Sequence, residues 1–284
     1  MTKHIKNLRE YGFPTENRTF VVAEIGINHG GDLNTAKRLI DSAAKTGADA
    51  VKFQTYLAKK RAPKGNQEIF DILKKCELPF TDFEKLREHS KQYEIEFFST
   101  PFDVESLEFL KSIGCELYKI ASFDVSNQML VSEVAKTGKT VLLSVGMASI
   151  SEITEAFQLL RKGTEKISLL HCISAYPTRE ENANLSAIFN LQETFDCVIG
   201  HSDHTPGIYV PLMAVAAGAQ IIEKHYRVDD SMDCIDAPVS ITETQMKHFV
   251  NEIRRLDRIF GGGEFGVRPD EKDMTSFRRS TPIS

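Results

Sequence analysis

Residues 199–207 read IGHSDHTPG and residues 221–226 read IIEKHY, with a helical run of small and apolar residues between them. Both segments begin with apolar residues of strand type and end in polar residues that can bind metal or phosphate. A strand, a helix and a second, parallel strand would bring the two polar ends side by side on one rim. The segment therefore predicts a crossover unit and, as a first hypothesis, a metal site built from His204 and His225.

The same strand-then-helix unit recurs along the chain on both sides of this segment. We expect strands at 20–28, 50–55, 96–100, 117–122, 140–146, 167–174, 197–201 and 219–228. We expect helices at 33–46, 81–93, 103–112, 128–136, 151–162, 184–194, 210–217 and 242–258, the first two capped by Asp32 and Thr81. Eight such units predict an α/β fold, a single-domain (β/α)8 TIM barrel.

The barrel is expected to span residues 20–260, because no linker or change of composition interrupts the pattern before Gly261. Residues 1–19 form a polar lead-in, and residues 261–284 are expected to be a polar, loose tail. Residues 57–80 are too long for an ordinary connection and predict a functional loop or an insertion.

The composition is typical of a soluble globular protein, with 41% hydrophobic and 26% charged residues. A net charge of −5 without a basic block argues against nucleic acid as a partner. The start lacks the apolar core of a signal peptide, and no apolar run is long enough to span a membrane. Five cysteines without paired spacing predict free thiols in a reducing cytoplasm.

The expected strands are apolar early and polar late. In barrels of this type the active site lies at the carboxyl ends of the strands, so this asymmetry favours an enzyme. The first strand carries Glu24 within its apolar run and Asn28 at its end. The polar residues of the later strands are Lys52, Gln54, Thr100, Lys119, Ser122, Ser144, His171, Ser174, Ser202, His204, Glu223 and His225.

The chemistry of this ring follows from its residue types. Lys52 and Lys119, with the nearby hydroxyls, suit an anion that carries both phosphate and carboxylate. Two imidazoles suit a divalent ion such as Mn, Co, Ni or Zn, whose remaining ligands would be water or substrate. Burial in an apolar strand would raise the pKa of Glu24 and suit it to proton transfer.

Simpler interpretations stay open for the same residues. A single histidine at a strand end is more often a hydrogen-bonded core residue than a ligand, although two on consecutive strands favour a metal. Lys119 can be a solvated charge on the rim, and the serines and threonines can be helix caps. Glu24 can pair with Lys52 as a buried salt bridge instead of acting in catalysis.

Several motifs at these strand ends resemble the sialic acid synthase family, the phosphoenolpyruvate-dependent synthases of nine-carbon 2-keto-3-deoxy sugar acids. The similarity covers about residues 20 to 260 in family order. The matching motifs are AEIGINH (23–29), VKFQT (51–55), STPF (99–102), YKIAS (118–122), LSVGM (143–147), LHCISAYP (170–177), GHSDHT (200–205) and IEKHY (222–226).

The resemblance implies a barrel that condenses phosphoenolpyruvate with the aldehyde of an N-acyl hexosamine and releases phosphate. It implies that His204 and His225 hold a divalent metal, usually Mn with Mg or Co as alternatives, and that Glu24 is the acid/base group that delivers water. Gln54, Tyr176 and Asp236 would face the sugar. The residues implied to hold phosphoenolpyruvate are Lys52, Thr100, Lys119, Ser122, Ser144, Ser174 and Ser202.

The chain departs from the family pattern at three places. Position 174 is serine, where some members have asparagine, and Asp233-Cys234-Ile235 stands before Asp236, where many members have Gly-Pro. Typical members continue into an antifreeze-like (SAF) domain that covers the partner's barrel in a homodimer and supplies an arginine to the sugar's acyl group. Here Arg278-Arg279-Ser280 resembles the start of the linker to that domain, and we expect no such domain in this chain; whether a homodimer forms stays open.

Three functions follow as hypotheses. The first is a cytoplasmic, metal-dependent synthase of sialic acid or a relative such as legionaminic or pseudaminic acid. The second keeps the barrel and phosphoenolpyruvate but uses a phosphorylated aldose. The third is a non-catalytic paralogue that binds sugar, against which the presence of Glu24, His204 and His225 together argues.

Overall fold

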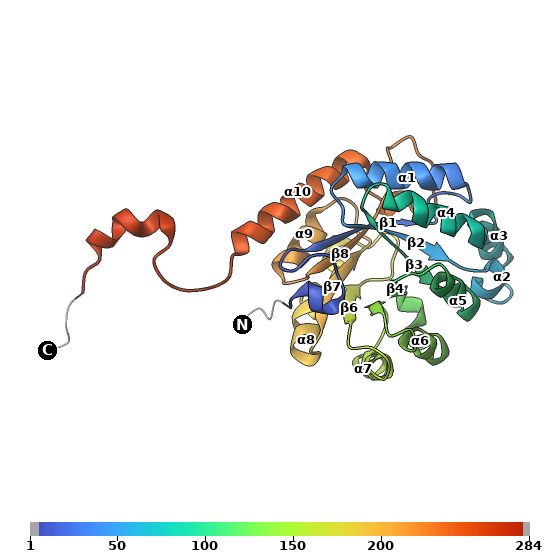
Figure 1. Cartoon of the computed structure of the whole chain (residues 1–284), viewed down its shortest axis with the longest axis horizontal. Coiled ribbons are helices and arrows are strands. Elements are labelled where there is room, and N and C mark those ends of the chain that lie inside the picture. The colour runs from blue at the N-terminus through green and yellow to red at the C-terminus, as the bar shows by residue number, and fades with distance from the viewer. Residues whose placement is uncertain (1–5, 281–284) are drawn as a thin grey trace.

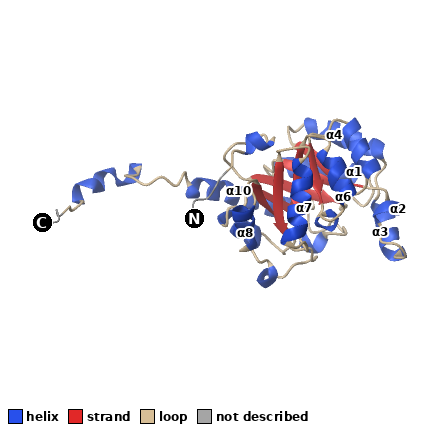
Figure 2. Ribbon diagram, turned by 90° about the horizontal axis from the view of Figure 1, so that it is seen from below, coloured by secondary structure: helices blue, strands red, loops and turns tan. Residues whose placement is uncertain are grey.

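Eight parallel strands close into a barrel in chain order, with β8 pairing back to β1. The structure, a computed structural model, describes residues 6–280, and the helices surround the strands in both views (Figures 1 and 2). The predicted (β/α)8 fold is confirmed. The strands are β1 (Phe20–Gly26), β2 (Ala50–Thr55), β3 (Glu96–Pro101), β4 (Leu117–Ile120), β5 (Thr140–Ser144), β6 (Ile167–Cys172), β7 (Val198–Asp203) and β8 (Ile221–His225).

Most of the covering helices begin where the sequence predicts. Asp32 caps the first helix by accepting from the Thr35 amide, as expected. Thr81 is not a cap, and that prediction is wrong, because Pro79 with its fixed φ starts the helix one residue earlier. The helices are α1 (Leu33–Lys45), α4 (Phe80–Lys91), α5 (Val104–Ser112), α6 (Gln128–Ala135), α7 (Ile150–Arg161), α8 (Ala187–Thr194), α9 (Tyr209–Ala216) and α10 (Glu243–Phe260).

Some strands end earlier than expected. β4 stops at Ile120 and β6 at Cys172, so Ser122 and Ser174 lie in the loops just beyond the barrel. Asn28 likewise follows the end of β1 and donates to the Tyr226 carbonyl oxygen at 2.9 Å. These residues are polar because they belong to the rim, where ladder hydrogen bonds give way to contacts between loops.

The barrel interior has two layers, because every second residue of a strand points inward and residues two apart lie at successive heights. The lower layer is apolar, and it includes the lead-in, whose Leu8 and Phe13 close the bottom of the barrel. The Phe13 and Phe20 ring centroids lie 4.9 Å apart. The lead-in, read from the sequence as polar, therefore contributes to the core. The strand residues of this layer are Phe20, Val22, Ala50, Phe98, Leu117, Leu142, Leu170, Val198 and Ile221.

Residues 57–80 fold as an insertion with two helices, α2 (Ala58–Arg61) and α3 (Gln67–Cys76). The insertion packs on the ends of β1 and β2 through a small apolar cluster that includes Ile27, Tyr56, Leu73 and Cys76. The Tyr56 hydroxyl donates to the Leu73 carbonyl oxygen at 3.0 Å and so ties β2 to α3. The insertion therefore lies beside the carboxyl ends of β1 and β2.

After Phe260 the chain leaves the barrel, and residues 261–280 extend away from it (Figures 1 and 2). Their side chains are exposed, and a 3-10 helix, η5 (Pro269–Phe277), is their only regular element. Residues 1–5 of the predicted lead-in and 281–284 of the predicted tail lie outside the described part. Within residues 6–280, none of the helices has the length and apolar character that crossing a membrane requires.

Candidate active site at the carboxyl end of the barrel

A polar pocket lies above the apolar layer, at the carboxyl ends of the strands. The position of the pocket follows from the alternation of side chains along the strands. Val22, Ala50 and Ile221 point into the lower layer. The residues two positions later therefore point into the upper layer, and they are Glu24, Lys52 and Glu223. The predicted residues that line the pocket are Glu24, Lys52, Gln54, Thr100, Lys119, Ser122, Ser144, Tyr176, Ser202, His204 and His225.

Two lysines share one carboxylate at the centre of this pocket. Lys52 Nζ lies 3.1 Å from Glu223 Oε2, and Lys119 Nζ lies 3.6 Å from Glu223 Oε1. The Ser202 hydroxyl donates to Glu223 Oε1 at 2.8 Å. All four side chains are nearly inaccessible to solvent. Glu223 is therefore the counter-ion of both lysines, a role that the sequence motifs did not assign to it.

In this cluster, the attraction between opposite charges opposes the effect of burial on the pKa values of the three ionisable side chains. Burial would raise the pKa of Glu223, but Lys119 and Lys52 outweigh it and hold that pKa below its ordinary value. Burial would lower the pKa of Lys52, but Glu223 and Glu24 raise it above the ordinary value. The pKa of Lys119 is lowered, since its burial is only partly offset by Glu223.

Glu24 lies on the wall beside this cluster. Its Oε1 accepts from Gln54 Nε2 at 3.1 Å, and its Oε2 lies 3.3 Å from Lys52 Nζ. Burial raises the pKa of Glu24 in spite of the attraction of Lys52. The salt bridge expected as the simple alternative is thus present, and the carboxylate also has the raised pKa that suits a proton-transfer group.

His204, just after β7, and His225, at the end of β8 beside Glu24, lie next to each other, with ring centroids 5.4 Å apart. The Nδ1 of His204 lies 2.7 Å from the Ile173 carbonyl oxygen, so Nδ1 carries the proton and Nε2 carries the lone pair. Burial lowers the pKa of His204 to about 3, which keeps the ring neutral. Nδ1 of His225 lies 3.3 Å from Asp236 Oδ2, and this carboxylate raises the pKa of His225 against the effect of burial.

These features fit a bound divalent ion. A backbone carbonyl that fixes the tautomer of a histidine is a common outer contact of metal sites. His225 sits within reach of the same space, and Asp236 stands behind it. No group of three or more histidine, cysteine or acidic side chains suited to a metal occurs within residues 6–280. The ion would therefore depend on two protein ligands and complete its sphere with water or substrate oxygens.

Comparison with known proteins agrees with this arrangement. The model of the NeuB family matches residues 39–265. The chain belongs to the NeuB family. It is 38% identical over 280 residues to the N,N'-diacetyllegionaminic acid synthase of Campylobacter jejuni, covering 93% of this chain and 84% of that protein. It is 33% identical over 284 residues to the pseudaminic acid synthase of the same species, and the match covers 94% of this chain and 82% of that protein.

A solved structure shows the same likeness in three dimensions. The crystal structure of N-acetylneuraminic acid (sialic acid) synthetase from Leptospira borgpetersenii, in complex with citrate, superposes with a TM-score of 0.90. The two chains are 43% identical, and the match covers 93% of each. The predicted resemblance to the sialic acid synthase family is therefore confirmed.

Two predicted residues join the NeuB-family pocket through contacts with its lining. The Ser174 and Ser122 hydroxyl oxygens lie 2.8 Å apart. Asp236 is held over the pocket by its backbone amide, which donates to Asn28 Oδ1 at 3.0 Å. The structure thus brings all the predicted site residues to one place, from β1 to the loop after β8.

Six further residues line the same NeuB-family pocket: Arg61, Phe102, Ala121, Phe123, Cys172 and Glu223. Glu223 lies within a motif, and its place two residues before His225 on one strand could have indicated that both face inward. Arg61 comes from the insertion. The basic run Lys59-Lys60-Arg61 was its only signal in the sequence.

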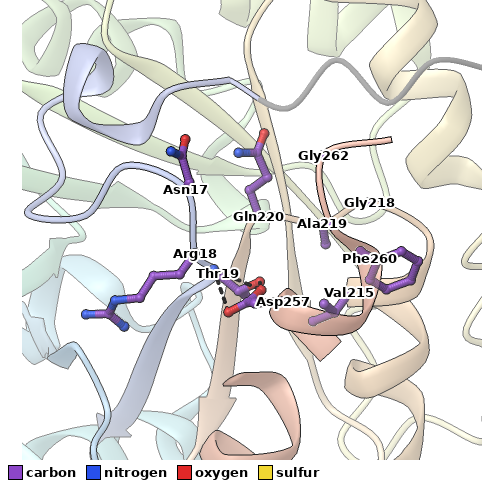
Figure 3. Close-up of a pocket in the computed structure, with 11 residues that line it drawn as sticks. Asn17, Arg18, Thr19, Val215, Gly218, Ala219, Gln220, Asp257, Phe260 and Gly262 are labelled. Carbon is purple, nitrogen blue, oxygen red and sulfur yellow. Dashed lines mark hydrogen bonds between the residues drawn. The ribbon is translucent and has the colours of Figure 1, made fainter. Parts of the chain in front are cut away.

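A cavity of about 590 Å³ lies at the other end of the barrel, between the segment before β1 and the end of α10 (Figure 3). Several of its polar groups have partners within the cavity or beside it. The Thr19 hydroxyl donates to Asp257 Oδ1 at 2.7 Å, and Arg18 pairs with Asp49 at 2.6 Å. Because these groups already have partners and lie at the amino ends of the strands, this cavity is not the candidate active site.

Proposed function

We propose that this chain condenses phosphoenolpyruvate with the aldehyde of an N-acyl hexosamine and yields a nonulosonic acid and phosphate. The observation that carries the proposal is the pairing of Lys52 and Lys119 with Glu223, in the same pocket as His204 and His225. The lysines supply two buried cations for a ligand with two anionic groups, and the histidines supply a place for an ion beside it. The NeuB-family relatives that act on related sugars support the choice of product class.

In the first step, C3 of phosphoenolpyruvate forms a bond to the aldehyde carbon, whose oxygen takes up a proton from solvent, and C2 gains oxocarbenium character. A divalent ion held by His204 and His225 would supply Lewis-acid polarisation of the aldehyde. Lys52 and Lys119 would exchange Glu223 for the phosphate and carboxylate of the substrate and so orient it. The hydroxyls of Thr100, Ser122, Ser144 and Ser202, with Ser174 close by, would complete this binding set.

In the second step, water adds to C2, and the adduct loses phosphate by cleavage of the C2–O bond while the new hydroxyl gives its proton to the leaving phosphate and the ketone forms. Glu24 would accept the proton of that water, since its raised pKa brings it closer to the operating pH. Gln54 holds the Glu24 carboxylate in place. Tyr176 and Asp236 would orient the acceptor sugar beside the histidines.

The test is turnover with phosphoenolpyruvate, Mn²⁺ and a panel of N-acyl hexosamines and aldose phosphates. Phosphate release is measured together with the mass of the keto acid, and a reaction without acceptor reports background hydrolysis. We expect a nine-carbon keto acid from at least one N-acyl hexosamine. Phosphoenolpyruvate binding without turnover of any acceptor would refute the synthase and favour a sugar-binding paralogue, and turnover of aldose phosphates alone would favour the second enzyme hypothesis.

A further inference from the structure

Arg61 is a half-buried cation that the mechanism above does not use. It ends α2, and its guanidinium carbon lies 3.9 Å from the centroid of the Phe102 ring and 4.5 Å from that of Tyr56. Both distances are typical of cation–π contacts. The side chain lines the same pocket as Glu24 and His204. The insertion therefore carries an arginine to the wall of the active site.

One donor atom of Arg61 lacks an acceptor. Its Nη1 is buried without a hydrogen-bond partner, and no ion pair of Arg61 is found in the part of the chain that the structure describes. A buried charged donor without an acceptor is costly, and native proteins rarely keep one without a reason. The lining position of Arg61 means that a bound ligand can supply the missing acceptor.

The surroundings of Arg61 indicate which part of the substrate it meets. Lys52 and Lys119 are engaged with Glu223, and the proposed function assigns them to phosphoenolpyruvate. Arg61 instead packs on the ring of Tyr56, two residues after Gln54 at the end of β2, and the carboxylates of Asp236 and Glu24 act on its charge. It thus lies toward the wall assigned to the acceptor sugar, where Gln54 and Asp236 also stand.

Charge decides between a phosphorylated and an uncharged acceptor. A phosphate dianion at Arg61 would gain one cation but would approach the carboxylates of Asp236 and Glu24. An uncharged oxygen gains the hydrogen bond without that repulsion. We propose that Arg61 is a specificity-determining residue whose guanidinium donates to an uncharged oxygen of the acceptor, a hydroxyl or an amide carbonyl, and so favours neutral acceptors over sugar phosphates.

This inference rests on the proposed function, and its test separates the two. In the turnover assay, Arg61→Met keeps an apolar stem against Phe102 and Tyr56 but removes every donor. We expect the KM for the N-acyl hexosamine to rise at least about tenfold, since a charged hydrogen bond is lost, while the KM for phosphoenolpyruvate stays within about twofold. Arg61→Lys keeps the charge without the planar fork, and it serves the same comparison if Arg61→Met does not fold.

The matched control is Arg87→Met, because Arg87 donates to the Gly114 carbonyl oxygen on the helical exterior; both constants should stay unchanged. An unchanged acceptor KM in an Arg61 variant, or an equal rise of both KM values, overturns the assignment. A wild-type preference for aldose phosphates that Arg61→Met abolishes also overturns it, because the residue then binds phosphate. Failure of the wild type to convert any acceptor refutes the proposed function itself, and with it the role of Arg61.

Discussion

Asp203 and Lys224, on neighbouring strands β7 and β8, form a fully buried ion pair with 2.6 Å between Oδ2 and Nζ. The pair lies behind the pocket, because Ser202 and Glu223, the residues just before them, point into it. Lys224 also donates to the Thr205 carbonyl oxygen, and the Thr205 hydroxyl donates to Asp203 at 2.9 Å. One buried network therefore fixes the ends of the two strands that carry His204 and His225.

Lys224→Met should lower the free energy of unfolding by about 3 to 5 kcal/mol, because it leaves Asp203 charged and buried without its cation. Urea unfolding monitored by circular dichroism measures the change. The double variant Asp203→Asn with Lys224→Met should recover part of the loss. Lys85→Met, which breaks an exposed pair with Asp82, should cost less than about 1 kcal/mol. Equal effects of Lys224→Met and Lys85→Met would show that the buried pair does not stabilise the strand ends.

A pH-dependent loss of stability is expected from His29. Burial lowers the pKa of His29 from 6.5 to about 4. Between these two pH values the imidazole is protonated in the unfolded chain but neutral in the folded chain. The contribution of neutral His29 to the free energy of unfolding is complete above pH 6.5, and it falls as the pH drops from 6.5 to 4. His29→Asn keeps an acceptor for the Gly31 amide and should lose about 2 kcal/mol less than wild type between pH 7.5 and pH 5. Parallel losses in the two proteins would contradict the prediction.

The fold could be predicted because the spacing of apolar residues differs between strands and helices, and because the polar residues gather at one end of the strands. Local signals do not specify contacts between distant segments. Leu8 and Phe13 lie in a polar lead-in, yet they close the barrel, since only the assembled strands provide the apolar surface that they cover. Arg61 reaches the pocket because the insertion packs on residues that follow β1 and β2, in an apolar cluster that contains Ile27 and Tyr56. Such placements are set by tertiary packing, which no motif encodes.

Gly31→Ala should destabilise the protein more than Gly30→Ala. Both glycines have positive φ, +83° and +60°, so both substitutions carry backbone strain of about 1 kcal/mol. A Cβ on Gly31 would in addition overlap the Lys75 carbonyl oxygen at the end of α3, whereas one on Gly30 meets nothing within 4 Å. The difference between their free energies of unfolding therefore isolates the contact that seats the insertion. Equal values would mean that α3 moves aside without cost.

Glu24→Gln distinguishes catalysis from a structural salt bridge. The amide keeps the size of the side chain, and Lys52 retains Glu223 as its partner, so the variant should unfold near the wild-type midpoint. The kcat for keto-acid formation should fall about 100-fold or more, because no proton acceptor remains. The control is Glu96→Gln, since burial also raises the pKa of Glu96 but its place at the start of β3 is remote from the pocket. A lower midpoint with kcat retained would assign Glu24 to structure alone.

His225→Ala should weaken Mn²⁺ binding at least about tenfold, because one of two proposed protein ligands is lost and even outer contacts of metal sites carry effects of that size. Binding is measured by the free Mn²⁺ signal in electron paramagnetic resonance, independently of turnover. His89→Ala is the matched control, since His89 contacts Asp41 at 2.5 Å on the helical layer and is remote from the pocket; its affinity should equal that of wild type. The His225→Ala variant should keep the wild-type circular dichroism spectrum, because the barrel below His225 is apolar and closed. Undiminished Mn²⁺ affinity in folded His225→Ala would remove this residue from the metal site, and the function proposed for the facing histidines would then need a different ligand set.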